Sequence, residues 1–206
     1  MSISPSAIAT NKSSSSELTR FEAHKLRWEV APEIQSLLAE ILVNSGQNEK
    51  KSRQRSVTRH GVGGKTFYRK NCFHNATWFA PMKYFFKIPA SRAEWQLAPR
   101  LQKLGIAVVP HLAHGELWTW HGLQESVLIT EGPTGFVPLK SIATSVVVQA
   151  ALGKFLRRLH GNGVFHSDLH ISNLLYSPEK NELCLVDLDN MKILPGLSRE
   201  QRMDNL

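Results

Sequence analysis

The chain has 206 residues, 42% of them hydrophobic, which is enough for one mid-sized domain or two small lobes that share a cleft. Its formal net charge of +8 suggests an anionic partner (a nucleotide, a nucleic acid, a phosphorylated sugar or an acidic membrane surface), although a merely soluble basic surface explains it equally well. No stretch approaches the roughly 18 uncharged apolar residues of a membrane span, and no signal peptide is recognisable, so we expect a cytoplasmic protein.

Residues 1–55 are predicted to precede the main domain. Their first sixteen residues are Ser-rich and typical of disorder. The segment "APEIQSLLAEILVN" repeats apolar residues at helical spacing after Pro32, which predicts a short amphipathic helix. The basic stretch "GQNEKKSRQR" then reads as a flexible linker. Because it carries no interleaved aromatic residues, we expect no nucleic-acid partner.

Residues 56–131 have the texture of a strand-rich lobe. The glycines of "SVTRHGVGGKTFYRK" lie between β-prone residues, and "PMKYFFKI" reads as a compact apolar strand. "SRAEWQLAPRLQKLGI" predicts a helix that Ser91 can cap and that Pro99 kinks or ends early. Short strands follow around "AVVPHLAHGEL" and "ESVLITE". Residues 132–206 form the second lobe: a long buried helix stopped by Gly161 and Gly163, then a loop and a hairpin. The class is therefore α+β with two lobes.

The hairpin in the second lobe brings polar side chains together. Asn173 and Asp187 stand at its two open ends, on either side of the turn "SPEKNE". A carboxylate and an amide carbonyl are hard oxygen ligands suited to Mg²⁺. Asp168, five residues before Asn173, is then free to orient a substrate hydroxyl or take its proton. This combination is what phosphoryl transfer requires.

The pattern "HSDLHISN…VDLD" resembles the catalytic loop and the metal-binding motif of the protein-kinase-like fold. The resemblance implies a strand lysine that binds the nucleotide phosphates and a helix glutamate that holds it, for which the sequence offers Lys87 and Glu94. Lys83 competes with Lys87, which has the more apolar flanks. The resemblance also implies a glycine loop over the phosphates and a hinge that meets adenine. The candidates for the loop and the hinge are Gly61, Gly63, Gly64, Thr130, Glu131 and Gly132.

Several departures narrow the class. Ser167 replaces the arginine of the protein-kinase loop, and "DLH" looks like small-molecule kinases such as those for aminoglycosides and choline. Four stretches in order, "FFKIPASRAEWQLAPRLQKLGIAVVPHLAHGE", "LITEGPTG", "HSDLHISNLL" and "VDLDNMKI", resemble the lipopolysaccharide kinase family over residues 56–206. That resemblance implies ATP and Mg²⁺ as cofactors, Kdo or heptose of the lipopolysaccharide inner core as acceptor, and peripheral association with the cytoplasmic face of the inner membrane.

Three other interpretations stay open. "HSDLH" alternates His166, Asp168 and His170 like the ligands of a metallohydrolase, although that function leaves Asn173 and Asp187 without a role. Another small-molecule kinase fits the same motifs. A catalytically impaired binding module is also open, because the chain stops soon after Asp187, where kinase-like folds continue with helices. We expect a second lobe that is minimal or truncated.

Overall fold

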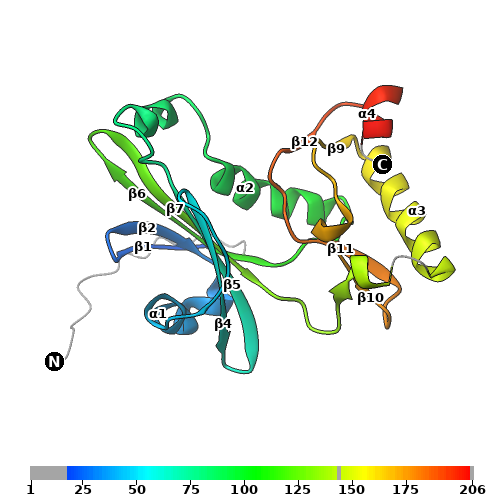
Figure 1. Ribbon diagram of the computed structural model, residues 1–206, viewed down its shortest axis with the longest axis horizontal. Helices are drawn as coiled ribbons and strands as arrows, with labels where there is room; N and C mark the ends of the chain where they lie inside the picture. The colour runs from blue at the N-terminus through cyan, green and yellow to red at the C-terminus, as the bar shows by residue number, and fades with distance from the viewer. Residues whose placement is uncertain (1–17, 143–144, 205–206) are drawn as a thin grey trace.

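The computed structural model describes residues 18–142 and 145–204, which form a large sheet and a smaller lobe of helices and short strands (Figure 1). The Ser-rich start predicted to be disordered lies outside the described residues. Within them, no helix is long and apolar enough to span a membrane.

Seven strands of the described chain form one antiparallel sheet. In spatial order they are β1 (Thr19–Ala23), β2 (Leu26–Val30), β6 (His111–Thr119), β7 (Gly122–Glu131), β5 (Lys65–Phe73), β4 (Arg55–Val62) and β3 (Gln47–Lys51). The hairpin of β4 and β5 closes through Gly63 and Gly64, at φ +57° and +76°. Two successive positive φ values fit the type I′ turn that matches strand twist, so these glycines serve a tight turn.

The sheet begins well before residue 56. β1, β2 and β3 all belong to it, and the linker predicted over residues 46–55 is wrong, since this segment forms β3 and the start of β4. Every residue of β3 is exposed. A strand that faces water on both sides needs no apolar alternation, so the sequence carried no strand signal there.

The predicted N-terminal helix is confirmed as α1 (Gln35–Val43), which follows the 3₁₀ turn η1 (Pro32–Ile34). Leu38 and Ile41 turn inward and pack with Trp28 of β2 and Phe67 of β5 in the core of the large sheet. Helix α1 therefore covers one face of that sheet (Figure 1).

The apolar strand predicted at Pro81–Ile88 is wrong. This segment forms the 3₁₀ helix η2 (Ala80–Phe85) and an exposed connection to helix α2 (Ala90–Lys103). Its large side chains face solvent rather than a sheet neighbour, so its apolar composition indicated a surface and not a buried strand. Helix α2 confirms the second predicted helix, but Pro99 does not end it early, and Ser91 lies inside it.

The smaller lobe holds the remaining elements. They are β8 (Val137–Pro138), η3 (Leu139–Ser141), α3 (Val146–Gly161), β9 (Val164–His166), η4 (Ile171–Asn173), β10 (Leu174–Ser177), β11 (Glu182–Leu185), β12 (Met191–Ile193) and α4 (Arg199–Asp204). The predicted long helix and the hairpin of β10 and β11 are confirmed. Strand β8 extends this hairpin on one side, and β9 pairs separately with β12.

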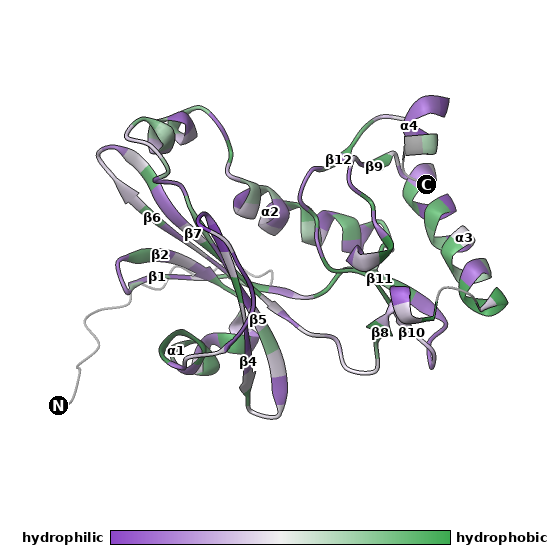
Figure 2. Ribbon diagram, viewed as in Figure 1, coloured by the Kyte–Doolittle hydropathy of each residue, from purple (hydrophilic) through white to green (hydrophobic). Residues whose placement is uncertain are grey.

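Helix α2 connects the large sheet to the smaller lobe. Its residues Leu97 and Leu101 are buried in the core of the smaller lobe, in the same cluster as Phe155 and Leu159 of α3. Figure 2 shows apolar and polar residues interleaved along both helices, as expected for helices with one buried face. The Leu185 amide also donates to the Ala107 carbonyl at 3.0 Å, which anchors β11 to the segment that enters β6. The end of β11 is thereby held beside the large sheet.

Candidate active site

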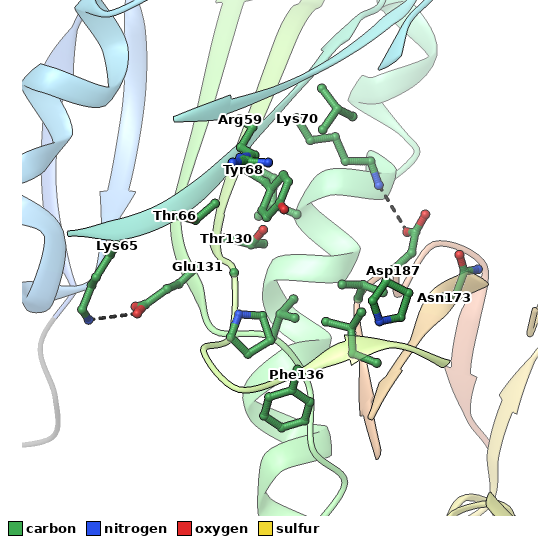
Figure 3. A pocket seen from close by; sticks show the side chains of 18 of the residues that line it. Arg59, Lys65, Thr66, Tyr68, Lys70, Thr130, Glu131, Phe136, Asn173 and Asp187 are labelled. Atoms are coloured by element: carbon green, nitrogen blue, oxygen red, sulfur yellow. Dashed lines mark hydrogen bonds and ion pairs between the residues drawn. The ribbon is translucent and has the colours of Figure 1, made fainter. Parts of the chain in front are cut away.

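A lysine between two carboxylates forms the centre of the site. Lys70 projects from the central strand β5, and its Nζ lies 2.7 Å from Oε1 of Glu94 on α2. The same Nζ lies 3.3 Å from Oδ1 of Asp187, just after β11 (Figure 3). The three side chains come from the sheet, the helix and the smaller lobe. This ion-pair cluster therefore forms only when all three are assembled.

Burial governs the charges of this cluster. The Glu94 side chain is only 3% exposed, and burial raises its pKa although the Lys70 ammonium opposes the shift. Burial also penalises the Lys70 ammonium, but the two carboxylates outweigh that penalty and raise its pKa. Burial alone would raise the pKa of Asp187, yet the lysine and the Asp189 backbone N–H hold it below the usual value. A positive charge is thus fixed at this position.

The lysine beside Glu94 is Lys70, and this corrects the assignment of that position to Lys87. The expected strand around Lys87 does not exist, and Lys87 is an exposed residue beyond η2. Lys83, the competitor, is also exposed, within η2 itself. The sequence predicted Glu94 as the helix glutamate that pairs with a strand lysine, and Glu94 does pair with one. The sequence signal for Lys70 was limited to its place in the β-prone run "KTFYRKNCF", which forms β5.

The two ends of the hairpin meet as the sequence predicted. The Val186 amide donates to the Asn173 carbonyl at 3.1 Å, so Asn173 and Asp187 are near neighbours across the hairpin. Asn173 Nδ2 donates to the Asp168 carbonyl at 3.3 Å, which leaves its Oδ1 as the atom suited to a cation. Asp187 Oδ1 accepts from Lys70 and from the Asp189 amide, so Oδ2 is its remaining ligand. These two oxygens fit a hard cation such as Mg²⁺.

His166 fastens the catalytic loop to the strand end. Its Nδ1 accepts the Asp168 amide at 3.2 Å, and its Nε2 lies 3.2 Å from the Asp187 carbonyl and donates to it. Burial lowers the pKa of His166, so the ring is neutral, as one donor and one acceptor nitrogen require. These contacts make His166 a hydrogen-bonded structural histidine. A catalytic base would need a ring nitrogen that takes part in neither of these two hydrogen bonds.

The side chain of Asp168 faces outward. It is 61% exposed, and its Oδ1 lies 2.6 Å from Nε2 of His170. His166 is engaged elsewhere, so the three side chains of "HSDLH" do not converge as metal ligands. No group of three or more His, Cys, Asp or Glu in the described ranges is placed to hold a metal ion. The structure gives the metallohydrolase interpretation no site.

A cavity of about 760 Å³ runs between the large sheet and the smaller lobe, with Lys70, Glu94, Asp187 and Asn173 on its wall. The predicted hinge lines the opposite side: Thr130, Glu131 and Gly132 (Figure 3). The backbone N–H groups of Glu131 and Gly132 already donate to the Pro110 and Thr66 carbonyls. Pro133 has no N–H, so the next donor on this wall is Thr134.

The predicted glycine loop lies at the hinge end of the cavity. Gly61 pairs with Thr66 inside the sheet, and only Gly64 of the three glycines lines the wall. Lys70 follows Gly64 by six residues along β5, roughly 20 Å away at the rise of a strand. The glycines therefore do not cover the centre around Lys70, which corrects their predicted place over the phosphates. Their apparent motif reflects the tight β4–β5 turn.

Arg55, at the start of β4, is the residue that approaches the centre from the sheet side. Its Nη2 lies 2.9 Å from Oδ2 of Asp189, and it lines the cavity with Lys50 and Arg59. Despite partial burial, the Asp189 carboxylate raises the pKa of Arg55, so its charge is permanent. The sequence reasoning missed Arg55 because it lay in the supposed linker. The available signal was the pair of basic residues Arg55 and Arg59, whose spacing of four places both side chains on one face of a strand.

The arrangement of an antiparallel sheet, a helix glutamate paired with a strand lysine, and a loop-plus-hairpin lobe defines a kinase-like fold. Among solved structures, the chain is similar to one described as WaaP in complex with acyl carrier protein, with a TM-score of 0.63 and 19% sequence identity. That likeness covers 87% of this chain and 78% of the other, and it shows the fold. No curated protein matches the chain.

The family follows from the sequence match. The model of the lipopolysaccharide kinase (Kdo/WaaP) family matches residues 38–204, so the chain belongs to this family. The protein is a kinase, as the sequence predicted. The match begins at residue 38, before the start at residue 56 over which the resemblance was predicted.

Proposed function

We propose that this kinase transfers the γ-phosphoryl group of ATP to a sugar hydroxyl, Kdo or heptose, of the lipopolysaccharide inner core. The observation that carries the proposal is the Lys70–Glu94–Asp187 cluster on the wall of the cavity. A fixed ammonium held by a buried carboxylate serves to orient phosphates, and the adjacent Asp187 oxygen serves a bound cation. Membership of the family supports the sugar acceptor.

ATP would lie along the cavity with adenine at the hinge and its phosphates toward Lys70. The cavity volume of about 760 Å³ is within the range of nucleotide-sized sites. Because the Glu131 and Gly132 amides are engaged, we assign the Thr134 amide as the hinge donor to adenine. Arg55 would leave Asp189 and contact a phosphate oxygen, since a guanidinium binds phosphate with two parallel donors.

The cation site fits Mg²⁺, which would neutralise phosphate charge in the transition state. Asn173 Oδ1 and Asp187 Oδ2 would hold it. His166 positions the base relative to the cation ligands. Its two hydrogen bonds join the Asp168 backbone to the Asp187 carbonyl, so the distance between the base and the cation site stays constant.

Asp168 is the catalytic base in this proposal. Its carboxylate accepts the proton of the acceptor hydroxyl as that oxygen bonds to the γ-phosphorus and the bond to ADP breaks. His170, 2.6 Å from the carboxylate, orients it. The exposure of both side chains suits a bulky acceptor that enters from outside the nucleotide cavity. A lipid-linked acceptor would place the reaction at a membrane surface.

Replacing Asp168 with asparagine tests the proposal. The variant should bind ATP almost as well as the original protein, because Lys70, Asn173 and Asp187 remain. Its turnover on inner-core lipopolysaccharide should fall by roughly 10²-fold or more, the usual scale for a lost general base. Calorimetry with and without Mg²⁺ gives the first value, and labelled ATP gives the second. Full transfer activity in the variant would show that Asp168 is not the base.

A further inference from the structure

We infer that a surface at one corner of the large sheet docks on an anionic lipid bilayer. This surface, called the aromatic corner below, comprises exposed side chains from η2, its flanks and the β6–β7 hairpin. They are Trp78, Phe79, Phe85, Phe86 and Trp120. The inference deepens the proposed function, on which it rests for the choice of a bilayer. Its test requires neither nucleotide nor sugar acceptor.

The aromatic corner is held in place by backbone packing. Helix η2 packs against β7, and in Figure 1 it is the short teal helix beside the tip of β6, at the opposite end of the molecule from α3. Gly122, at φ +112°, lies so close to the Pro81 carbonyl that a Cβ atom would overlap it. The aromatic side chains therefore project from a fixed base.

The side chains themselves face solvent. Phe86 is 97% exposed and Trp120 is 81% exposed, far more than aromatic residues usually are in a soluble domain. The ring of Trp78 lies 6.2 Å from that of Trp120, so residues distant in sequence gather into one patch. Contiguous exposed apolar surface of this kind marks a site of interaction.

The charge of the aromatic corner indicates an anionic partner. Neither segment that builds the corner, residues 77–93 or 117–124, contains an aspartate or a glutamate. Lys83 and Lys87 are exposed within the first of them. Aromatic side chains that insert at the headgroup level, flanked by lysines whose ammonium groups reach lipid phosphates, are the arrangement of peripheral membrane anchors. The exposed lysine first assigned to the nucleotide thus acquires a different role.

Vesicle flotation tests the inference with the full chain. We expect the protein to float with vesicles of phosphatidylethanolamine and phosphatidylglycerol and to bind much less to phosphatidylcholine alone. The variant Phe86→Ser/Trp120→Ser should lose flotation. The matched control, Val146→Ser/Val147→Ser, removes two exposed apolar side chains of α3, 78% and 57% exposed, and should float like the original protein. Equal flotation of both variants would overturn the inference, as would no flotation of the original protein.

The lysines provide an independent measurement. Lys83→Gln/Lys87→Gln should weaken binding to the anionic vesicles by roughly 25-fold, about fivefold for each charge near an anionic surface. High salt should reduce binding in the original protein and much less in this variant. An undiminished affinity in the variant would show that the corner does not face the lipid.

Tryptophan fluorescence locates the contact. Trp28 and Trp95 are buried, and the part-exposed Trp118 donates its N–H to Glu116, so Trp78 and Trp120 are the indoles best placed to meet lipid. Brominated phospholipids should quench the original protein much more strongly than Trp78→Phe/Trp120→Phe. Absence of quenching in the original protein would overturn the inference. If the original protein self-associates in the absence of vesicles and Phe86→Ser/Trp120→Ser does not, the corner belongs to a contact with a second copy instead. Vesicle binding without phosphate transfer would leave this inference standing and refute the proposed reaction.

Discussion

Replacing Lys70 with methionine removes the charge from the centre of the site and keeps most of the side-chain volume. The Glu94 carboxylate, 3% exposed, then loses its partner at 2.7 Å. Removing one member of a buried pair typically costs 3–5 kcal/mol. We expect about 3 kcal/mol in the free energy of unfolding at pH 8, the low end, because Glu94 can bind a proton instead.

The loss should depend on pH with a defined sign. Burial raises the pKa of Glu94, and without Lys70 nothing opposes that shift. An acid with a raised folded pKa keeps a proton that the unfolded chain has released, so stability falls as pH rises above the unfolded value near 4.5. The variant should therefore lie close to the original protein at pH 5 and well below it at pH 8.

Urea unfolding at both pH values provides the assay. Lys87→Met is the matched control, since it makes the same change at an exposed site, and it should stay within about 0.5 kcal/mol of the original protein. Lys70→Met/Glu94→Leu should recover much of the loss, because it replaces both charges with apolar groups. Equal losses at pH 5 and pH 8, or a Lys87→Met loss as large as that of Lys70→Met, would refute the reasoning.

Three further predictions concern other parts of the molecule. Arg55→Gln should weaken ATP binding about tenfold, measured by calorimetry. Arg53→Gln, at an exposed neighbouring position, should leave the affinity unchanged, and equal affinities of the two variants would contradict the contact between Arg55 and phosphate. Burial lowers the pKa of His114 to about 4. Its neutral form therefore contributes stability that is lost below pH 6.5, by about 1.4 kcal/mol per pH unit at most, and His114→Gln should flatten that slope in urea titrations. Gly122→Ala should lower the melting temperature through its overlap with Pro81, whereas Gly153→Ala in α3 should raise it; similar shifts would refute the packing argument.

Local patterns made the loop and the hairpin predictable. Asp168, Asn173 and Asp187 lie within twenty residues, and a hairpin with a polar turn brings its ends together by geometry alone. Helix α2 was equally accessible, because its apolar residues follow helical spacing and its glutamate lies on the buried face. The family resemblance then supplied the identity of the fold.

The lysine was not predictable in the same way. Lys70 is buried by partners 24 and 117 residues away, and its immediate neighbours, Arg69 and Asn71, are polar. Lys87 has apolar neighbours, but these are exposed in the aromatic corner and do not bury it. Apolar flanks identify a buried lysine only where the segment lies in the sheet. Strand pairing of this kind depends on contacts that a local window does not contain.

Phosphate transfer to competing acceptors tests the central claim most directly. The protein would be incubated with γ-labelled ATP and Mg²⁺ and, separately, with inner-core lipopolysaccharide, casein and an aminoglycoside. We predict label in the lipopolysaccharide, on a Kdo or heptose hydroxyl, and none in the other two. Label in casein or the aminoglycoside alone, or no transfer to any acceptor, would contradict the proposed reaction.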